Sequence, residues 1–144
     1  MFDFLVTKRL RSIGYCVDLL RMELQGDGNC YLHIQTDWSL KQNGVLLLSQ
    51  DDLNTAVQCD LRGDFDAYGQ FVTRVENILS AGLQNMRVQC VQVLSNNLLL
   101  TFEGGYFFET VGCSEDNDDD EWWRVIDKAK DVHYVMYKSG VEIL

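Results

Sequence analysis

Proline is absent from the 144 residues, and the 11 glycines are scattered along the chain. No proline-rich or glycine-rich linker therefore divides it. The sequence also lacks any run of about 18 uncharged apolar residues, the length that a membrane-spanning helix requires. With 47% hydrophobic residues, a chain of this length buries one core of ordinary size and is too short for two comfortable domains. We expect a single domain over residues 1–144 and no membrane partner.

Closely spaced cysteine pairs are missing as well. The five cysteines include no Cys-x-x-Cys pair, which argues against a disulfide scaffold and against the usual zinc sites. Basic residues follow the apolar stretch 2–6, which reverses the order found in a secretory signal. We therefore expect a reduced protein of the cytoplasm. The cysteines are Cys16, Cys30, Cys59, Cys90 and Cys113.

The common catalytic motifs do not occur. The chain has no glycine-rich phosphate loop and no Gly-x-Ser-x-Gly elbow. The two histidines, His33 and His133, have no partner at a metal-ligand spacing such as His-x-x-x-His. The acidic run near the C-terminal end lacks the glycine that the sixth position of a calcium loop requires. The sequence therefore predicts no enzyme, no metal and no cofactor.

Acidic residues are what the sequence has in excess. There are 22 acidic against 12 basic residues, a formal net charge of -10, and such a field repels phosphate backbones and attracts basic partners. We therefore expect no nucleic-acid partner. Six acids fall within residues 115–121: Glu115, Asp116, Asp118, Asp119, Asp120 and Glu121.

Two explanations fit this acidic run. The simpler one is a solvated loop that keeps the protein soluble, with Arg124 paired to nearby acids. The other is an interface, because Trp122 and Trp123 follow directly, and interface anchors commonly combine aromatic area with charge. On a strand, the two tryptophans point to opposite faces, so at most one is easily exposed.

Hydrophobic periodicity predicts an α+β fold made of two antiparallel β-meanders with one main amphipathic helix between them. The helix begins at Phe65, is capped by Asp64, and ends near Gly82, where a left-handed backbone conformation is favoured. The expected strands are 15–25, 30–37 and 45–49 in the first meander, 87–94, 98–103 and 106–111 in the second, and a closing pair at 134–137 and 140–143. Residues 1–13 fit a short helix or an edge strand equally well.

The two meanders show a weak internal sequence similarity. The segments 32–34 and 37–40 can be laid against 100–102 and 105–108 at the same spacing. A duplicated unit explains this similarity, and so does the general likeness of any two hairpins that have an aromatic residue after the turn.

The string from Gly26 to Cys30 (Gly-Asp-Gly-Asn-Cys) resembles the nucleophile motif of ovarian-tumour-type cysteine proteases. In that family a distant histidine followed by an aromatic residue supplies the base, and His133 with Tyr134 occupies a similar place here. The family continues from its cysteine into a helix, whereas residues 31–35 look like a strand. A hairpin turn that ends in cysteine is the better explanation, and a protease that uses Cys30 and His133 is the alternative function.

A second resemblance covers most of the chain, through short motifs. The matching residues are Leu32-His33-Ile34-Gln35, Trp38 and Asp51 in the first half, and Leu100-Thr101-Phe102, Gly105-Tyr106, Glu121-Trp122-Trp123-Arg124, His133 and Gly140-Val141-Glu142 in the second. With these residues the chain looks like a group of small bacterial proteins, several of which are immunity proteins of polymorphic or contact-dependent growth inhibition toxin systems. At Ser39, many members of the group carry Arg.

The resemblance implies an intracellular protein that binds and neutralises a cognate toxin C-terminal domain by blocking its active site or substrate groove. The acidic balance fits a basic, nuclease-like toxin. The expected toxin-binding residues are Asp116, Asp118, Asp119, Asp120, Glu121 and Trp122. A self-assembling structural protein is a further hypothesis, in which copies of the chain would pair through the exposed edges of the two meanders.

Overall fold

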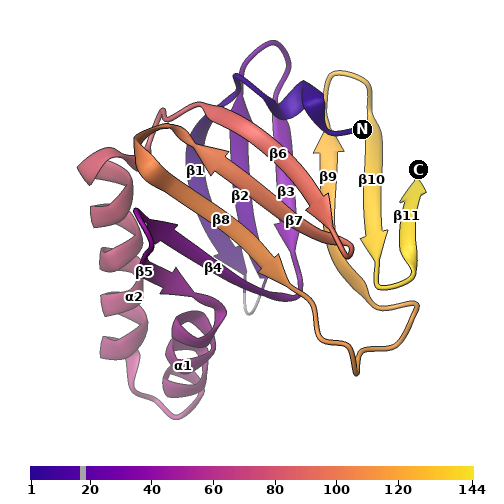
Figure 1. The fold of residues 1–144 in the computed structure, drawn as a ribbon. Coiled ribbons are helices and arrows are strands. Elements are labelled where there is room, and N and C mark those ends of the chain that lie inside the picture. The colour runs from indigo at the N-terminus through magenta and orange to yellow at the C-terminus, as the bar shows by residue number, and fades with distance from the viewer. Residues whose placement is uncertain (17–18) are drawn as a thin grey trace.

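A computed structural model describes residues 1–16 and 19–144, which form two antiparallel sheets and two α-helices (Figure 1). The six-stranded sheet has the spatial order β1 (Arg9–Cys16), β2 (Leu19–Gln25), β3 (Cys30–Ile34), β9 (Glu121–Asp127), β10 (Val132–Tyr137) and β11 (Gly140–Ile143). The five-stranded sheet has the order β5 (Val45–Ser49), β4 (Asp37–Gln42), β8 (Tyr106–Val111), β7 (Asn97–Phe102) and β6 (Val88–Leu94). The helices are α1 (Gln50–Leu61) and α2 (Phe65–Ile78). The predicted α+β class with antiparallel strands is confirmed.

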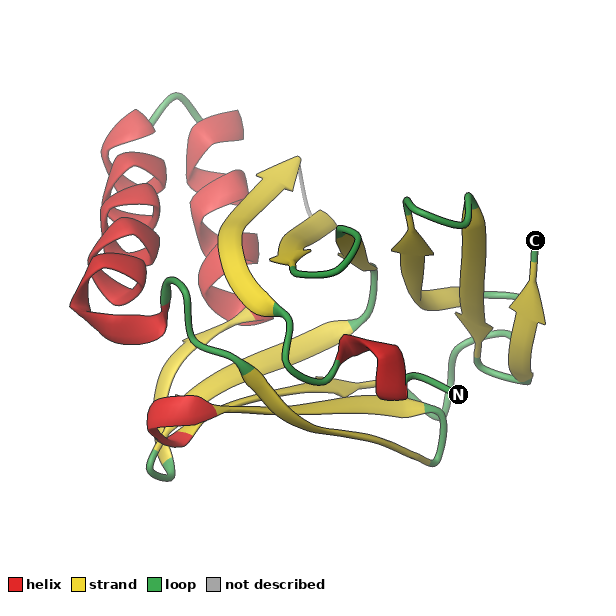
Figure 2. Ribbon diagram, turned by 90° about the horizontal axis from the view of Figure 1, so that it is seen from above, coloured by secondary structure: helices red, strands yellow, loops and turns green. Residues whose placement is uncertain are grey.

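The two sheets face each other, and the helix pair lies at one side of them (Figures 1 and 2). Alternation along the strands directs one set of side chains inward, where large apolar residues such as Leu32, Phe108 and Trp123 are fully buried. Helix α2 packs against β1, where the Tyr15 ring meets the Phe71 ring edge-on at 5.0 Å between centroids. The core is therefore enclosed by both sheets and the helix pair.

The chain crosses between the sheets at two neighbouring places. Strand β3 leads into β4, while β9 pairs with β3 and β8 pairs with β4. At the first crossing the backbone N–H groups of Gln35 and Thr36 both donate to the Trp122 carbonyl, at 2.9 and 3.1 Å. The second crossing, from β8 to β9, is made by residues 112–120. This pairing places the acidic loop at the end of the sandwich where the two sheets exchange strands.

In the first predicted meander the pair of β2 and β3 is confirmed and the placement of the third strand is wrong, while the second meander is confirmed. Strands β6, β7 and β8 are consecutive neighbours in one sheet. In the first half, by contrast, β2 and β3 belong to the six-stranded sheet, and β4 and β5 belong to the other. The predicted strand 15–25 corresponds to the end of β1 and all of β2, and its residues 17 and 18 lie outside the described residues. The start of the chain forms a 3-10 turn at Asp3–Leu5 and then β1.

The predicted helix is present, but its end differs from the prediction. The Asp64 carboxylate accepts from the Asp66 N–H at 3.2 Å, which confirms the cap. Beyond Ile78 the chain continues through a π-helical turn, Leu79–Leu83, and Gly82 is extended (φ 162°) instead of left-handed. A Cβ at Gly82 would lie 2.9 Å from the Tyr106 hydroxyl, so close packing is the reason for glycine there.

Helix α1 was not predicted. Its start is fixed by a capping box, in which the Ser49 N–H donates to the Asp52 carboxylate at 2.8 Å. Only three of its twelve residues are buried, namely Gln50, Leu53 and Ala56. Such a narrow apolar stripe leaves a weak periodic signal in the sequence.

Candidate functional site

Cys30 and His133 do not form a catalytic pair in this structure. Cys30 pairs with Asp127 of β9. His133 of β10 pairs with Ile126, and Ile126 in turn pairs with Tyr31, the residue after Cys30. Neighbouring residues on a strand point to opposite faces, so the thiol and the imidazole lie on opposite faces of the sheet. Cys30 is buried, and desolvation raises the pKa of its thiol. A nucleophilic cysteine needs the reverse shift and a nearby base, so this geometry does not suit protease chemistry.

The glycine-rich string before Cys30 has a structural explanation. It forms the hairpin turn between β2 and β3, with Gly28 in the left-handed region at φ 83°. The amine of Lys8, which is only 5% exposed, donates to the carbonyls of Asp27 (2.9 Å) and Gly28 (2.7 Å). The turn thus satisfies a buried ammonium group, and the expectation of a hairpin that ends in cysteine is confirmed.

The acidic loop between β8 and β9 is held in a defined shape by Lys138, which lies in the turn between β10 and β11. Its amine donates to the carbonyl of Ser114 at 2.6 Å and to that of Asp116. Its backbone N–H donates to the Asp120 carbonyl at 3.1 Å. In this way a single basic residue binds the loop at three carbonyl groups.

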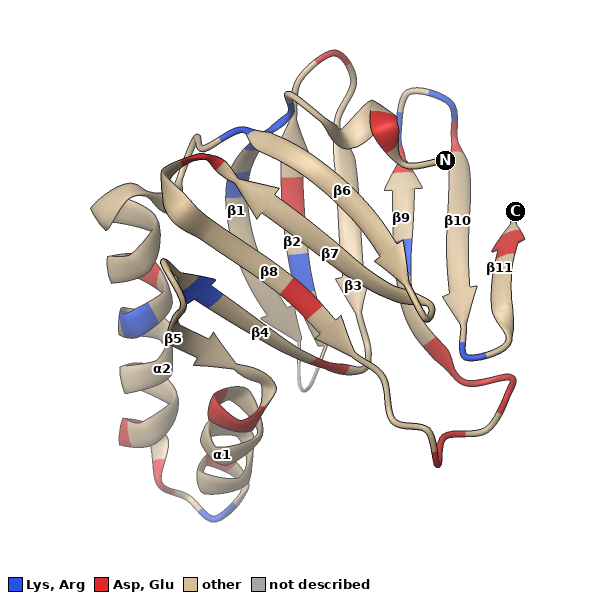
Figure 3. Ribbon diagram, viewed as in Figure 1, with Lys and Arg blue, Asp and Glu red and all other residues tan. Residues whose placement is uncertain are grey.

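Further hydrogen bonds fix the loop from within. The Asn117 N–H donates to the Asp120 carboxylate at 3.0 Å, and the Asp120 N–H donates to the Asn117 carbonyl at the same distance. At the start of the loop, Gly112 passes directly over the Trp122 ring, where a Cβ would lie 2.3 Å from a ring carbon. The Trp122 indole N–H donates to the Asp116 carboxylate at 2.9 Å. The acids are therefore carried on an ordered loop (Figure 3).

Trp122 does not reach the surface, contrary to the expected binding set. It is 6% exposed, and Trp123 on the opposite face is fully buried against the Phe2 ring, 5.4 Å away between centroids. Both faces of β9 are covered at this point, one by the core and the other by the loop itself. Trp122 therefore positions Asp116 and supports the loop from below.

The remaining acids of the run divide into two groups. Glu115, Asp118 and Asp119 are exposed, and none forms an ion pair with a described residue. Asp116, Asp120 and Glu121 are half-buried and make the contacts that hold the loop or the strand. Glu121 accepts from Arg124 and Gln35, so the simpler explanation for Arg124, a pair with a nearby acid, is confirmed. The acids that the loop exposes to solvent are thus a triad of Glu115, Asp118 and Asp119.

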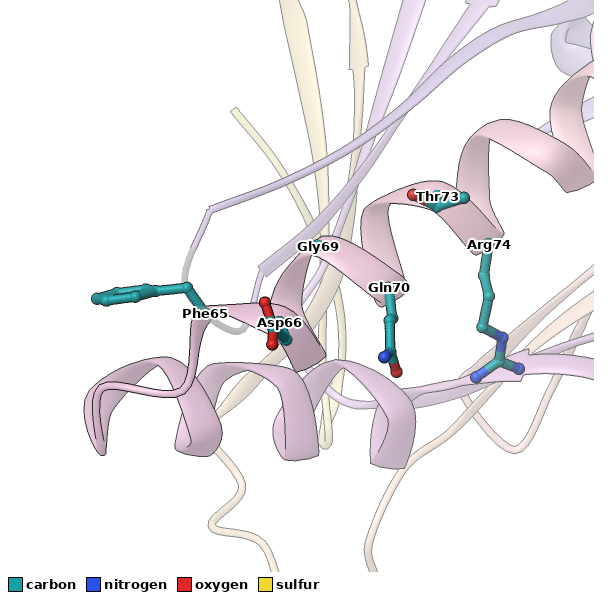
Figure 4. Close-up of a pocket in the computed structure, with 6 residues that line it drawn as sticks. All are labelled: Phe65, Asp66, Gly69, Gln70, Thr73 and Arg74. Carbon is teal, nitrogen blue, oxygen red and sulfur yellow. The ribbon is translucent and has the colours of Figure 1, made fainter.

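A shallow hollow of about 680 Å³ follows one face of α2 (Figure 4). Its lining comes from a single helix, with Phe65 pointing away at one end and Arg74 at the other. The Arg74 guanidinium is already bound by the Asp52 carboxylate at 3.0 Å and by the Leu47 carbonyl at 2.8 Å. No polar groups converge on a shared point here, so this hollow offers no site for chemistry.

Among residues 1–16 and 19–144, no three His, Cys, Asp or Glu side chains are placed to hold a metal ion together. None of the helices in this part of the chain has the length and apolar character needed to cross a bilayer. The site and the fold together define an α+β protein with an ordered acidic loop where the chain crosses from β8 to β9. Comparisons with protein-family models, curated proteins and solved structures find no match to this chain.

Proposed function

We propose that this protein is a cytoplasmic immunity protein that binds a basic toxin domain, and that the triad of Glu115, Asp118 and Asp119 meets the toxin first. The toxin supplies the chemistry, and this chain blocks its active site or substrate groove. A nuclease domain is the toxin class that fits, because its substrate groove must attract a phosphate backbone and is therefore basic.

The observation that carries this proposal is the order of the acidic loop. A surface whose charged groups are already held in place loses little conformational entropy on binding, so more of the interaction energy appears as affinity. Three carbonyl groups bound by Lys138 and the Trp122 hydrogen bond provide that order. The exposed carboxylates add electrostatic steering, which raises the rate of association with a partner of opposite charge.

Several further features are consistent with a binding role inside the cell. All five cysteines are free thiols, as expected in a reducing compartment. A nuclease groove binds nucleic acid. The carboxylates of the triad repel nucleic acid, so a groove that they cover excludes its substrate.

Charge reversal of the triad is the test. The variant Glu115→Lys, Asp118→Lys, Asp119→Lys should lower the association rate with the toxin domain encoded next to this gene by at least about tenfold at low salt. The difference should shrink as salt screens the charges. Stopped-flow fluorescence of the toxin domain measures both.

A matched control reverses three exposed acids outside the loop, Asp3, Asp27 and Glu76, which changes the net charge by the same amount. If the field of the whole protein steers association, both variants slow equally, and the triad has no special role. If neither variant changes the rate, the acidic surface lies outside the interface.

A further inference from the structure

The outer face of the six-stranded sheet carries a row of two arginines and a histidine that the acidic character of the protein does not predict. Arg21 on β2 pairs with His33 on β3, and His33 pairs with Arg124 on β9. Basic positions on β2 and β9 are visible in Figure 3. Like charges directly opposite each other across strands are unfavourable. Desolvation first, and then Arg21 and Arg124, lower the pKa of His33.

The two arginines of this row differ in how their charge is balanced. Arg124 donates from Nε to the Glu121 carboxylate at 3.1 Å. Arg21 forms no ion pair with a described residue, and its guanidinium lies over the Tyr31 ring, 4.6 Å from the centroid. A guanidinium held over an aromatic face still has the N–H groups of its own plane free to donate to an anion. Among the described residues, no carboxylate forms an ion pair with Arg21, so its guanidinium can accept an outside anion as partner.

A hollow of about 390 Å³ opens beside Arg21 and His33. Gly14 on β1 pairs with Arg21, and a Cβ at Gly14 would meet nothing within 4 Å, so the missing side chain leaves space next to the guanidinium. The volume lies within the range of small-molecule sites, roughly 300–1,000 Å³. None of the described residues that line it is acidic: Ser12, Ile13, Gly14, Tyr15, Cys16, Leu19, Arg21 and His33.

The acid nearest in sequence to Arg21 on the same strand face is Glu23, and its carboxylate is already engaged by Ser12 and Arg11. Its carboxylate accepts from the Ser12 hydroxyl at 3.3 Å and lies 3.9 Å from the Arg11 guanidinium. Glu23 does not line the hollow. Among the described lining residues, the titratable side chains are thus Tyr15, Cys16, Arg21 and His33, and Arg21 is the one that carries a permanent positive charge.

We propose that this hollow binds the oxyanion of a small molecule, a phosphate or a carboxylate, with Arg21 as the main donor and His33 as the second. The planar guanidinium offers paired N–H groups that match two oxygens of either anion. The bound charge offsets the repulsion along the row of Arg21, His33 and Arg124. This site is built from β1, β2 and β3, whereas the acidic triad lies between β8 and β9, and the proposal does not depend on the proposed immunity function.

The proposal is tested by the protonation of His33. An anion beside an imidazole favours its charged form, so binding should raise the pKa of His33 by about 1 unit. We expect this rise on adding sodium phosphate or sodium acetate, compared with sodium chloride at matched ionic strength, in NMR titrations of the imidazole signals. The charged or titratable groups that act on His33 are Arg21, Arg124, Glu121 and His133.

The response to each probe identifies the ligand group. A rise with phosphate alone indicates a phosphorylated ligand, a rise with acetate alone indicates a carboxylate, and a rise with both supports an oxyanion of either kind. The absence of a rise with either anion overturns the proposal.

Two variants distinguish anion binding in the hollow from a general effect of ions on the pKa of His33. Arg21→Gln removes the main donor, and Gly14→Val fills the hollow without changing any charge, so both should abolish the rise in the pKa of His33. Arg62→Gln, at an exposed position in the turn between the helices, should leave it unchanged. A rise that persists in both Arg21→Gln and Gly14→Val would contradict the site.

Discussion

Replacing Lys138 with Met should loosen the acidic loop while leaving the rest of the fold intact. Methionine keeps an apolar stem of similar length and removes only the amine, which donates to the carbonyls of Ser114 and Asp116. Hydrogen bonds from charged groups contribute about 1.5–3 kcal/mol each when one partner is removed from a buried site. This amine is partly exposed, so water replaces part of the loss, and we expect about 1–2 kcal/mol for the opening of the loop.

Amide hydrogen exchange detects this local effect. A change of 1–2 kcal/mol corresponds to a factor of roughly 5–30 in the fraction of open loop. The N–H groups of Asp116, Asn117 and Asp120 report on it, because each donates within the loop. Their exchange should accelerate by that factor in Lys138→Met, while amides of the buried strands remain protected.

The control is Lys130→Met, at an exposed position in the turn between β9 and β10. It changes the net charge in the same way and should leave exchange in the loop unaltered. Equal exchange of the loop amides in wild type and Lys138→Met would refute the reasoning that Lys138 orders the acidic surface.

Three further predictions follow from individual contacts. Gly112→Ala should lower the free energy of unfolding by about 1–3 kcal/mol in urea denaturation, because its Cβ would overlap the buried Trp122 ring. Cys30 should react with a thiol reagent far more slowly than the exposed Cys113, because burial raises the pKa of the Cys30 thiol. The folded state lowers the pKa of His33 below 6.5, so protonation favours the unfolded state. His33 therefore destabilises the fold as the pH falls below 6.5, and His33→Gln should reduce that loss in denaturation curves.

Each of these three predictions has a measurable outcome that would contradict it. Gly69→Ala is the matched control for the first, since Gly69 lies within α2 with nothing near its Cβ position, and alanine there should stabilise by about 0.5–1 kcal/mol. A Gly112→Ala variant as stable as wild type would show that the ring can move aside. Rapid labelling of Cys30 in the folded protein would mean that the thiol is accessible. Parallel stability curves for wild type and His33→Gln below pH 6.5 would contradict the third.

Local patterns in the sequence were sufficient for the elements that depend on local interactions. Helix α2 follows from a wide apolar stripe and an Asp64 cap, and the β2–β3 hairpin follows from its glycine-rich turn. Strand pairing between distant segments was not predictable. The pairs β3 with β9 and β4 with β8 join residues far apart along the chain, and no local signal specifies which sheet a strand enters.

The same limit applies to the candidate sites. The acidic run was visible in the sequence, but the contacts that order it come from Lys138, whose carbonyl partners on the loop lie some twenty residues away. Trp122 looked like an exposed anchor because an aromatic residue beside a charged loop is typical of interfaces. Its burial depends on Gly112, which lets the chain pass over the ring. The row of Arg21, His33 and Arg124 has no sequence signature, since it exists only through register across three strands.

The most direct test of the central claim is calorimetry between this protein and the toxin domain encoded immediately upstream of its gene, with the charge-reversed triad measured beside it. We predict one-to-one binding with a Kd on the order of nanomolar, weakened by the triad reversal but not by reversal of Asp3, Asp27 and Glu76. The absence of binding by the wild-type protein would contradict the immunity function, and tight binding unaffected by the triad reversal would place the interface elsewhere on the molecule.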